Sequence, residues 1–311
     1  MALKTIFFGT PAPAARCLQE LIASRHHVLA VVTAPDKPAG RGMQLSVSPT
    51  KVAAGSASID IIQPETLRSG DIHQVLHSYA ADVFVVVAFG MIFPKQVLDI
   101  PPRGCLNVHF SLLPHLRGAA PVQWALIEGL SITGVTVMQM DEGLDTGPII
   151  SQVEEPIEPH DTAGTLLDRL SVKGAELLVR TLDSIDEGRG HSTPQNHASA
   201  TLAPKLSRDD ARIDWNMDAS GIANRVRAFD PRPGAWTTWK GRSIKLWKVS
   251  IAPDPGSMGP GSIDVAGSDL LFVESASNRL LIEELQPEGK SRMTASEFIR
   301  GYRPMIADRF E

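Results

Sequence analysis

Two polar side chains suited to acyl-transfer chemistry lie two residues apart at the end of an apolar run. Asn107 and His109 fall within GCLNVHFSLLP, which has the composition of a buried strand until it reaches a proline-containing turn. Residues two apart on a strand project from the same face. An amide can donate to an oxyanion and an imidazole can relay a proton. An Asn–His pair that only bonds a neighbouring loop is the alternative interpretation, because buried polar groups need partners.

A carboxylate that could orient the imidazole follows in MQMDEGLDTGPII. Asp145 lies there in a glycine-punctuated loop after a predicted strand at 133–140, together with Asp141. A carboxylate bonded to an imidazole fixes its tautomer and orientation. An ordinary Asp-Gly turn would explain the same letters, so the loop is not decisive by itself.

The elements that must position these residues alternate between strand and helix over the first 190 residues. Apolar strands are predicted at 3–9, 27–33, 59–62, 82–90 and 105–110, and helices at 14–24, 73–80, 121–129 and 162–185. Strands that are apolar on both faces are typical of a parallel sheet covered by helices. We therefore predict an α/β fold with a Rossmann-like, doubly wound, mostly parallel sheet, followed by a strand pair at 133–140 and 147–157.

A polar, non-periodic stretch divides the chain. We assign 1–189 to the α/β domain, 190–207 to a linker and 208–311 to a C-terminal domain. The last part contains a hairpin signal around Lys240-Gly241, several short strands, and a helix that begins with the capping-box pair Thr294 and Glu297. This pattern predicts a small, OB-like β-barrel.

Composition narrows the function classes. The 311 residues carry a net charge of −5, yet residues 205–250 hold ten Lys and Arg against five Asp and Glu. Such a segment can attract phosphates, although a solvated charged face is the plainer alternative.

Cys17 and Cys105 are the two cysteines, too few for a disulfide framework or a Cys-based metal site. No apolar run is long enough to span a bilayer and no signal peptide is recognisable, so we expect a cytoplasmic protein, a monomer by default, without a metal.

The phosphate-binding motifs of nucleotide-binding proteins are missing. The first predicted strand ends in FFGTPAPAA, with one glycine where a dinucleotide fingerprint has three, and the sequence contains no G-x-x-x-x-G-K-[ST] motif. A ligand other than NAD or ATP should therefore bind at the carboxyl edge of the sheet.

Taken together, the motifs resemble the folate-dependent formyltransferases. NVHFSLLPHLRGAAP followed by GVTVMQMDEGLDTGPII is similar to that family's Asn-x-His, Ser-Leu-Leu-Pro and Asp-x-Gly-x-Asp-Thr-Gly series. FFGTP, PDKPAGRG, DVFVVVAFGMIFP, LSRDDARIDW and RAFDPRPGAW resemble the branch whose acceptor is methionyl-tRNA. The resemblance runs from about residue 4 to about residue 250. Phe110 and His115 depart from the family pattern, which has a small residue and an Arg or Lys there.

The resemblance implies transfer of a formyl group from 10-formyltetrahydrofolate, a co-substrate, to the α-amino group of initiator methionyl-tRNA, for translation initiation. It implies that Asn107 donates to the oxyanion, His109 accepts or relays a proton and Asp145 orients the imidazole. It also implies a folate site formed by the turn and strand end Ser111, Leu112, Leu113, Pro114, Phe89, Gly90, Met91 and Ile92.

Contacts with tRNA are implied at two places. The Pro/Gly-rich segment 34–51 would reach the acceptor end of the tRNA through Lys37 and Arg41, although a solvated loop is the alternative. The C-terminal domain would bind the phosphate backbone through Lys205, Arg208, Arg225, Arg227, Lys240, Arg242, Lys245 and Lys248.

Three alternatives stay open at this level. The chain could formylate a small amine, hydrolyse 10-formyltetrahydrofolate, or bind tRNA without catalysis. The second domain argues against a glycinamide ribonucleotide enzyme, which is normally a shorter chain. The joint presence of Asn107, His109 and Asp145 argues against a non-catalytic protein.

Overall fold

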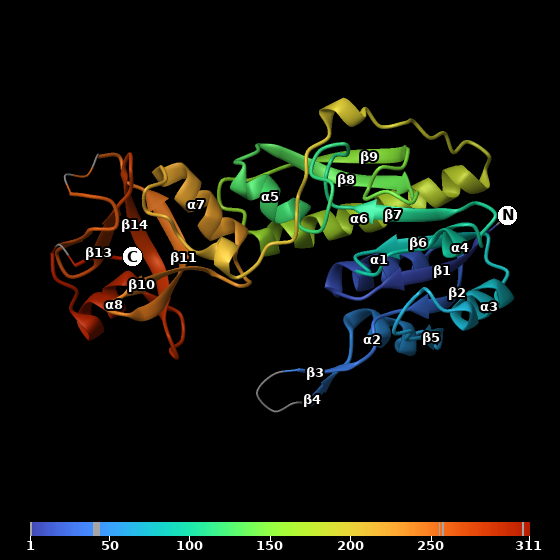
Figure 1. Ribbon diagram of the computed structural model, residues 1–311, viewed down its shortest axis with the longest axis horizontal. Coiled ribbons are helices and arrows are strands. Elements are labelled where there is room, and N and C mark those ends of the chain that lie inside the picture. Colours follow the sequence, from blue (N-terminus) through green and yellow to red (C-terminus); the bar gives the residue numbers. More distant parts are fainter. Residues whose placement is uncertain (1, 40–43, 255, 257, 307) are drawn as a thin grey trace. The chain divides into compact units, whose positions relative to one another are not determined.

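The computed structural model describes residues 2–39, 44–254, 256, 258–306 and 308–311. The chain divides into two compact units, coloured along the sequence in Figure 1. Unit 1 comprises residues 1–121, 132–156 and 167–203, and unit 2 comprises 122–131, 157–166 and 204–311. Within the described ranges, no helix has the length and apolarity needed to cross a membrane.

Unit 1 is built on a seven-stranded sheet with the order β5-β2-β1-β6-β7-β8-β9 (Figure 1). Its parallel part consists of β1 (Lys4–Gly9), β2 (His27–Val32), β5 (Asp60–Ile62), β6 (Val83–Val87) and β7 (Cys105–His109). β8 (Ile132–Gln139) and β9 (Ile149–Pro156) extend it as antiparallel strands. The predicted α/β class with a mostly parallel sheet is confirmed.

Helices cover both faces of the central part of this sheet (Figure 1), which explains why β6 is apolar and buried along its whole length. The helices of unit 1 are α1 (Ala12–Ala23), α2 (Pro49–Ser56), α3 (Gly70–Ser78), α4 (Lys95–Leu98) and most of α6 (Ala163–Asp186). After its first residue, α5 (Pro121–Ile127) belongs to unit 2. Phe8 and Phe84 belong to one core cluster with Leu76 of α3 and Val97 of α4. Phe7, the residue before Phe8 on β1, is also fully buried. Because neighbouring side chains on a strand point to opposite faces, Phe7 packs on the other face of the sheet.

The segment 34–51 contains a small sheet where the sequence predicted a loop. β3 (Lys37–Ala39) and β4 (Gln44–Ser46) pair antiparallel. Lys51 Nζ, at the base of this segment, lies 2.5 Å from Asp36 Oδ2 and 2.7 Å from Gln63 Oε1. The hydrogen bond from Lys51 lowers the pKa of Asp36 below its ordinary value. Arg41, the proposed tRNA contact between the two strands, lies outside the described residues.

Unit 2 contains an antiparallel sheet, as expected for a small barrel. Its path is β10 (Ala235–Trp239), β11 (Arg242–Ile251), β14 (Arg279–Pro287), β13 (Leu270–Glu274) and β12 (Ile263–Ala266), with β15 (Met293–Thr294) beside β14. The predicted hairpin turns at Lys240 and Gly241, which both have positive φ, as its tight turn requires. Helices α7 (Ala219–Ala228) and α8 (Ala295–Tyr302) complete the unit, and the predicted capping box at the start of α8 is present.

Candidate active site

A cavity of about 630 Å³ lies at the carboxyl ends of β6 and β7. Its walls come from the ends of both strands, from residues 88–93 and from the loop 141–145 that follows β8. Open α/β sheets bind their ligands at this edge, because the loops that follow parallel strands converge there. The cavity is therefore where the fold would place a substrate.

Asn107 and His109 both line this cavity from β7. β7 runs between β6, its parallel neighbour, and β8, its antiparallel neighbour. The two side chains lie on one face of the strand, as their two-residue spacing requires. His109 is buried, with 6% of its surface exposed, so its ring is held in a fixed orientation by its neighbours.

The carboxylate of Asp145 lies between these two side chains. Asn107 Nδ2 donates to Asp145 Oδ1 over 3.4 Å, and the backbone N–H of Gly118 donates to Oδ2 over 2.8 Å. His109 Nδ1 lies 3.7 Å from Oδ2, within ion-pair range but longer than a hydrogen bond. The structure thus brings together the three residues that the sequence singled out from two distant segments.

The imidazole of His109 faces an oxygen on each side. Its Nε2 lies 2.9 Å from the carbonyl oxygen of Leu116, and its Nδ1 faces Asp145. A ring protonated on Nε2 alone donates to Leu116 and leaves Nδ1 able to accept a proton. A doubly protonated ring can donate to both oxygens. This arrangement suits a group that takes up and releases one proton on its Nδ1 side.

The strand end Phe89, Gly90, Met91 and Ile92 forms one wall of the cavity. The hydrogen bonds between described residues do not include the backbone groups of 89–93, so these donors and acceptors can serve a ligand. Gly90 has φ +80°, a conformation that favours glycine. An apolar wall with free backbone groups is suited to a flat heteroaromatic ring.

The Ser-Leu-Leu-Pro turn is placed differently from the strand end. Ser111, Leu112, Leu113 and Pro114 are all described, and they lie outside the lining of the cavity. Ser111 Oγ donates to the carbonyl of His115 over 2.6 Å, and the N–H of Leu113 donates to Thr136 Oγ1 over 3.1 Å. The bond from Leu113 links the turn to Thr136 of β8, and the role of the turn in binding folate stays a prediction.

Phe110, which departs from the family pattern, also lines the cavity. It follows His109 and is buried against α6. A side chain at Gly174 of that helix would come within 3.3 Å of the Phe110 ring. The glycine in α6 therefore makes room for the larger side chain.

Three residues that the sequence did not single out support the site. Leu116 and Gly118 contact His109 and Asp145 through their backbone. Gln195 is buried, and its Nε2 donates to the carbonyl oxygens of Asp145, over 2.9 Å, and Gly147, over 2.6 Å. The sequence could not indicate Leu116 and Gly118, because they act through backbone groups that every residue has. It did not indicate Gln195, because this residue lies in the polar segment predicted to be a linker.

Much of that segment lies along unit 1. Thr193 exchanges two backbone hydrogen bonds of 2.8 Å with Ile149 of β9. Arg117 donates its N–H to Thr201 and accepts from the N–H of Ala203, over 2.9 and 2.7 Å. Unit 1 accordingly extends to Ala203.

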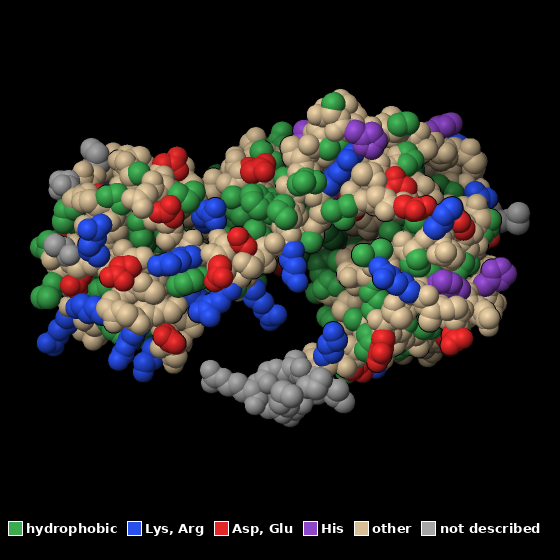
Figure 2. Space-filling model, in the orientation of Figure 1, with side chains coloured by type: hydrophobic (Ala, Val, Ile, Leu, Met, Phe, Trp, Pro, Cys, Tyr) green, Lys and Arg blue, Asp and Glu red, His purple; other side chains and the backbone are tan. Residues whose placement is uncertain are grey.

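The basic residues proposed for tRNA binding differ in how they are engaged. Lys205, Arg208 and Arg242 are exposed, and Figure 2 shows Lys and Arg side chains standing out from the surface of unit 2. Lys37 of unit 1 is also exposed. Five others contact groups of the protein. Lys248 pairs with Glu283 and Lys240 with Asp308, although both lysines are exposed. Lys245, Arg225 and Arg227 donate to backbone carbonyls.

Arg227 is half-buried. Burial lowers its pKa, while the nearby Asp161 acts in the opposite direction. Its Nη2 donates to Asn224 over 2.7 Å. The Arg227 side chain therefore packs within unit 2.

Two of the tryptophans in this region belong to the core: Trp239 and Trp247 are each 7% exposed. Trp236 is half-buried and lies beside Arg208 and Arg212.

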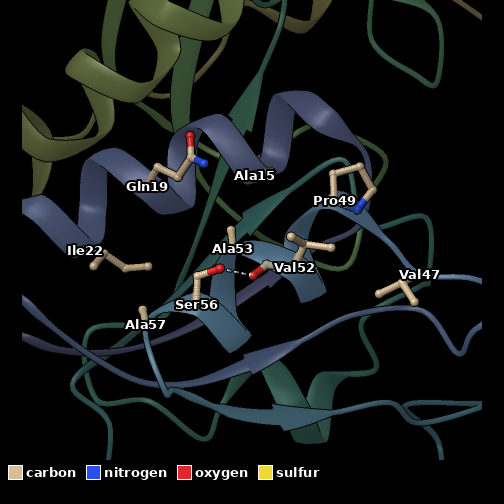
Figure 3. Close-up of a pocket in the computed structure, with 9 residues that line it drawn as sticks. All are labelled: Ala15, Gln19, Ile22, Val47, Pro49, Val52, Ala53, Ser56 and Ala57. Atoms are coloured by element: carbon tan, nitrogen blue, oxygen red, sulfur yellow. Dashed lines mark hydrogen bonds between the residues drawn. The ribbon is translucent and has the colours of Figure 1, made fainter.

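A second hollow, of about 550 Å³, lies between α1 and α2 (Figure 3). Apolar side chains such as Ile22 and Val52 form most of its wall, and its polar side chains are Gln19 and Ser56. The Ser56 hydroxyl donates to the carbonyl of Val52 within α2. This hollow lacks the acid–base groups that the first cavity has.

Cysteine and metal chemistry find no support in the described residues. No group of three or more His, Cys, Asp or Glu among them could hold a metal ion. Cys17 and Cys105 are buried, and burial raises the pKa of each thiol to about 12, so neither is a thiolate nucleophile near neutral pH.

Comparison with known proteins gives the family. The Formyl transferase model matches residues 3–182, and the model of the Formyl transferase C-terminal domain matches residues 205–303. The chain is 43% identical over 300 residues to the methionyl-tRNA formyltransferase of Desulfotalea psychrophila, covering 96% of this chain and 93% of that protein. It is also 43% identical over 309 residues to that of Nitrosomonas eutropha, covering 99% and 98%.

Solved structures show the same fold at lower identity. One is the N-formyltransferase from Helicobacter canadensis in complex with folinic acid and dTDP-3-aminofucose, with a TM-score of 0.64, 20% identity, and coverage of 92% of this chain and all of that one. Another is HypX from Aquifex aeolicus in complex with tetrahydrofolic acid, with a TM-score of 0.67 and 16% identity. There the match covers 98% of this chain and 48% of HypX. By its matched domains and its full-length relatives, the chain belongs to the methionyl-tRNA formyltransferase family.

Proposed function

We propose that this protein transfers the formyl group of 10-formyltetrahydrofolate to the free α-amino group of methionyl-tRNA and so produces formylmethionyl-tRNA for translation initiation. The proposal rests on one observation: relatives that are 43% identical over nearly the whole chain are methionyl-tRNA formyltransferases. The cavity at the end of β7 adds chemical support, because it collects an amide, an imidazole and a carboxylate.

The reaction needs a neutral amine, a donor for the oxyanion and an acceptor for a proton. The methionyl nitrogen attacks the formyl carbon and forms a C–N bond, and the carbonyl oxygen takes the electron pair. In the second step that pair returns, the bond between the formyl carbon and the folate nitrogen breaks, and the folate nitrogen gains a proton. The proton that leaves the attacking amine balances this gain.

Each of the three side chains has a role in this scheme. Asn107 offers an amide N–H to the developing oxyanion; losing one such donor typically costs about 10²–10³ in rate. His109 relays the proton from the attacking nitrogen, an effect of roughly 10²–10⁴. Asp145 orients the imidazole and stabilises it when it is charged.

The folate co-substrate would occupy the cavity beside the strand end Phe89, Gly90, Met91 and Ile92. A volume of about 630 Å³ is in the usual range for small-molecule sites. The backbone groups of 89–93 would bind the polar edge of the pterin. The turn of Ser111, Leu112, Leu113 and Pro114, which follows β7, would also hold the folate.

We assign the RNA contacts to two places. In unit 1, Lys37 and Arg41 would meet the acceptor end of the tRNA. In the second domain, the phosphate contacts would come from Lys205, Arg208, Arg225, Arg227, Lys240, Arg242, Lys245 and Lys248. We keep the proposed division into 1–189, a connecting segment 190–207 and 208–311, with the connecting segment packed on unit 1 as far as Ala203. We also keep an initiator tRNA as the acceptor and a cytoplasmic monomer.

A direct assay tests this function against its alternatives. The purified protein is incubated with 10-formyltetrahydrofolate carrying a labelled formyl group and with methionyl-tRNA, a small amine such as an amino sugar, or buffer alone. We expect the label on the methionyl amine. Label on the small amine, or folate deformylation at the same rate in buffer alone, would replace the proposal with the corresponding alternative.

A further inference from the structure

Two buried side chains, Arg117 and Gln195, hold the backbone of the loop that carries Asp145. Arg117 and Gln195 are each 6% exposed. Arg117 donates to Gln195 Oε1 from both Nε, over 3.1 Å, and Nη2, over 2.6 Å. The amide nitrogen of Gln195 then donates to the carbonyl oxygens of Asp145 and Gly147. Every polar atom of the Gln195 side chain is therefore engaged, and its orientation is set by the guanidinium.

Arg117 also lies between the two backbone groups that contact the proposed catalytic residues. The carbonyl of Leu116 meets His109 Nε2 over 2.9 Å, and the N–H of Gly118 donates to Asp145 Oδ2 over 2.8 Å. The bonds close a ring that runs from His109 through 116–118 to Gln195 and the Asp145 loop. A displacement of Gln195 would consequently act on the imidazole and the carboxylate together.

Asp145 needs such support because its backbone is in the left-handed region, with φ +53°. This region is unfavourable for residues other than glycine and persists where the surroundings enforce it. The carbonyl of Asp145 is one of the two that Gln195 binds. The amide therefore acts on the strained residue itself and not only on the loop around it.

The segment that carries Gln195 is itself fixed to unit 1. Besides the Thr193 and Thr201 contacts described above, the hydroxyl of Thr201 accepts the N–H of Leu116 over 2.8 Å. A side chain at Gly118 would approach the carbonyl of Ala203 to 2.6 Å. The polar stretch is thus fixed to unit 1 on both sides of Gln195, to β9 through Thr193 and to the 116–118 backbone through Thr201 and Ala203.

We propose that Gln195, oriented by Arg117, is a positioning residue for formyl transfer: it holds Asp145 in the conformation that presents its carboxylate to His109. The inference rests on the proposed function. It predicts that losing the Gln195 amide lowers turnover and leaves substrate binding nearly intact. In metal sites, residues that orient a ligating side chain contribute about 10- to 100-fold, and we expect an effect of similar size here.

The test compares Gln195→Met with Asn196→Leu. Gln195→Met keeps the length of the side chain and removes its donors. Asn196 is an exposed amide beside it whose bonds are local, to Ala198 and Ser199, so Asn196→Leu is the matched control. We expect Gln195→Met to lower kcat about 10- to 100-fold, to change KM for both substrates less than about twofold, and to displace the pH–rate profile. Asn196→Leu should match the wild type in all three.

Two further variants separate positioning from folding. Gln195→Glu keeps the acceptor for Arg117 and, when ionised, loses both donors, so it should show the same loss of kcat. Arg117→Lys keeps a cation but not the two-pronged contact with Gln195 Oε1, and its loss should be intermediate. Assays are run well below the unfolding temperature of every variant.

A structural readout keeps the result independent of turnover. The ¹⁵N chemical shifts of the His109 ring are recorded at one pH in the wild type and in Gln195→Met, and we expect them to differ because the Asp145 carboxylate beside the ring is displaced. A Gln195→Met protein with unchanged kcat and unchanged His109 signals would overturn the inference. A wild type that fails to formylate methionyl-tRNA would instead remove the proposed function, and the ring signals would still show whether Gln195 positions the Asp145–His109 pair.

Discussion

Asp145 Oδ2 and His109 Nδ1 lie 3.7 Å apart, within ion-pair range and about an ångström beyond the usual hydrogen-bond length. The same carboxylate oxygen accepts the N–H of Gly118 over 2.8 Å. Catalytic hydrogen bonds are often long before substrate binds and shorten in the complex. The pair is therefore arranged to tighten when the ring gains a proton.

Replacing the carboxylate should separate its role from that of the loop. Asp145→Asn keeps the shape of the side chain and removes its charge. We expect kcat to fall about 10²–10⁴-fold, because the neutral amide can no longer stabilise the charged imidazole. KM for the folate should change little. Steady-state kinetics of methionyl-tRNA formylation measure both values.

Asp99→Asn serves as the control for that substitution. Asp99 is an exposed carboxylate that pairs with Lys95 and lies outside the lining of the cavity. Its variant should retain wild-type kcat. Turnover of Asp145→Asn within tenfold of the wild type would remove Asp145 from the proposed mechanism.

Asn107 should act on the oxyanion and not on the binding of either substrate. Asn107→Ala removes the amide that faces the cavity, and we expect kcat to fall about 10²–10³-fold. The dissociation constant for tetrahydrofolate, measured by calorimetry, should stay within about twofold. A large loss of folate affinity with normal kcat would assign Asn107 to binding.

Some of this site was predictable because its signals are local. The run VFVVV predicts a strand buried on both faces, and β6 is fully buried. The spacing of Asn107 and His109 predicts one shared face, and both line the cavity. Because side chains alternate between the two faces of a strand, five or six residues of sequence are enough to show which side chains share a face.

The rest depends on contacts between distant segments. Residue type does not distinguish Asp145 from Asp141, whereas the structure does: Asp141 Oδ1 accepts from Gly143 and Thr146 within its own loop. Gln195 meets Asp145 across fifty positions of sequence. The three-residue strands β3 and β4 are likewise too short to show a hydrophobic period, so the sequence predicted a loop there. Local propensity contains no information on such partners.

Binding of tRNA by unit 2 should depend on salt through the cations that remain accessible. Lys205 and Arg242 are exposed, and the double variant Lys205→Gln/Arg242→Gln should raise KM for methionyl-tRNA without changing kcat. If each cation neutralises one phosphate, the slope of log affinity against log salt should fall by about 0.7–0.9 per residue. Titrations at several salt concentrations measure this slope.

Lys248→Gln is the comparison for that pair. The Lys248 ammonium lies 2.7 Å from Glu283, and this partner already offsets its charge. Lys248 is also exposed, so the comparison isolates the effect of the ion pair. The Lys248 variant should change KM and the salt slope less than replacement of either Lys205 or Arg242 does. Equal effects from Lys248 and Arg242 would contradict a surface whose affinity depends on unpaired cations.

Stability should decrease on mild acidification because of His26. The side chain is buried, and its Nδ1 accepts the N–H of Leu3 over 3.1 Å. Burial lowers the pKa of His26 below 6.5, and Arg25 acts in the same direction, while Asp183 and Asp186 oppose them. The unfolded chain therefore takes up this proton at a higher pH than the folded one. The contribution of His26 to stability is fully present above about pH 6.5 and is lost as the pH falls toward the folded-state pKa.

Thermal unfolding between about pH 7.5 and pH 5.5 tests this linkage. His26→Asn keeps an acceptor and removes the titration, so its Tm should decline less steeply with falling pH than that of the wild type, even if the smaller side chain lowers Tm throughout. His27→Asn, at the exposed neighbouring position, should follow the wild-type slope. Parallel declines in wild type and His26→Asn would place the acid sensitivity in other groups.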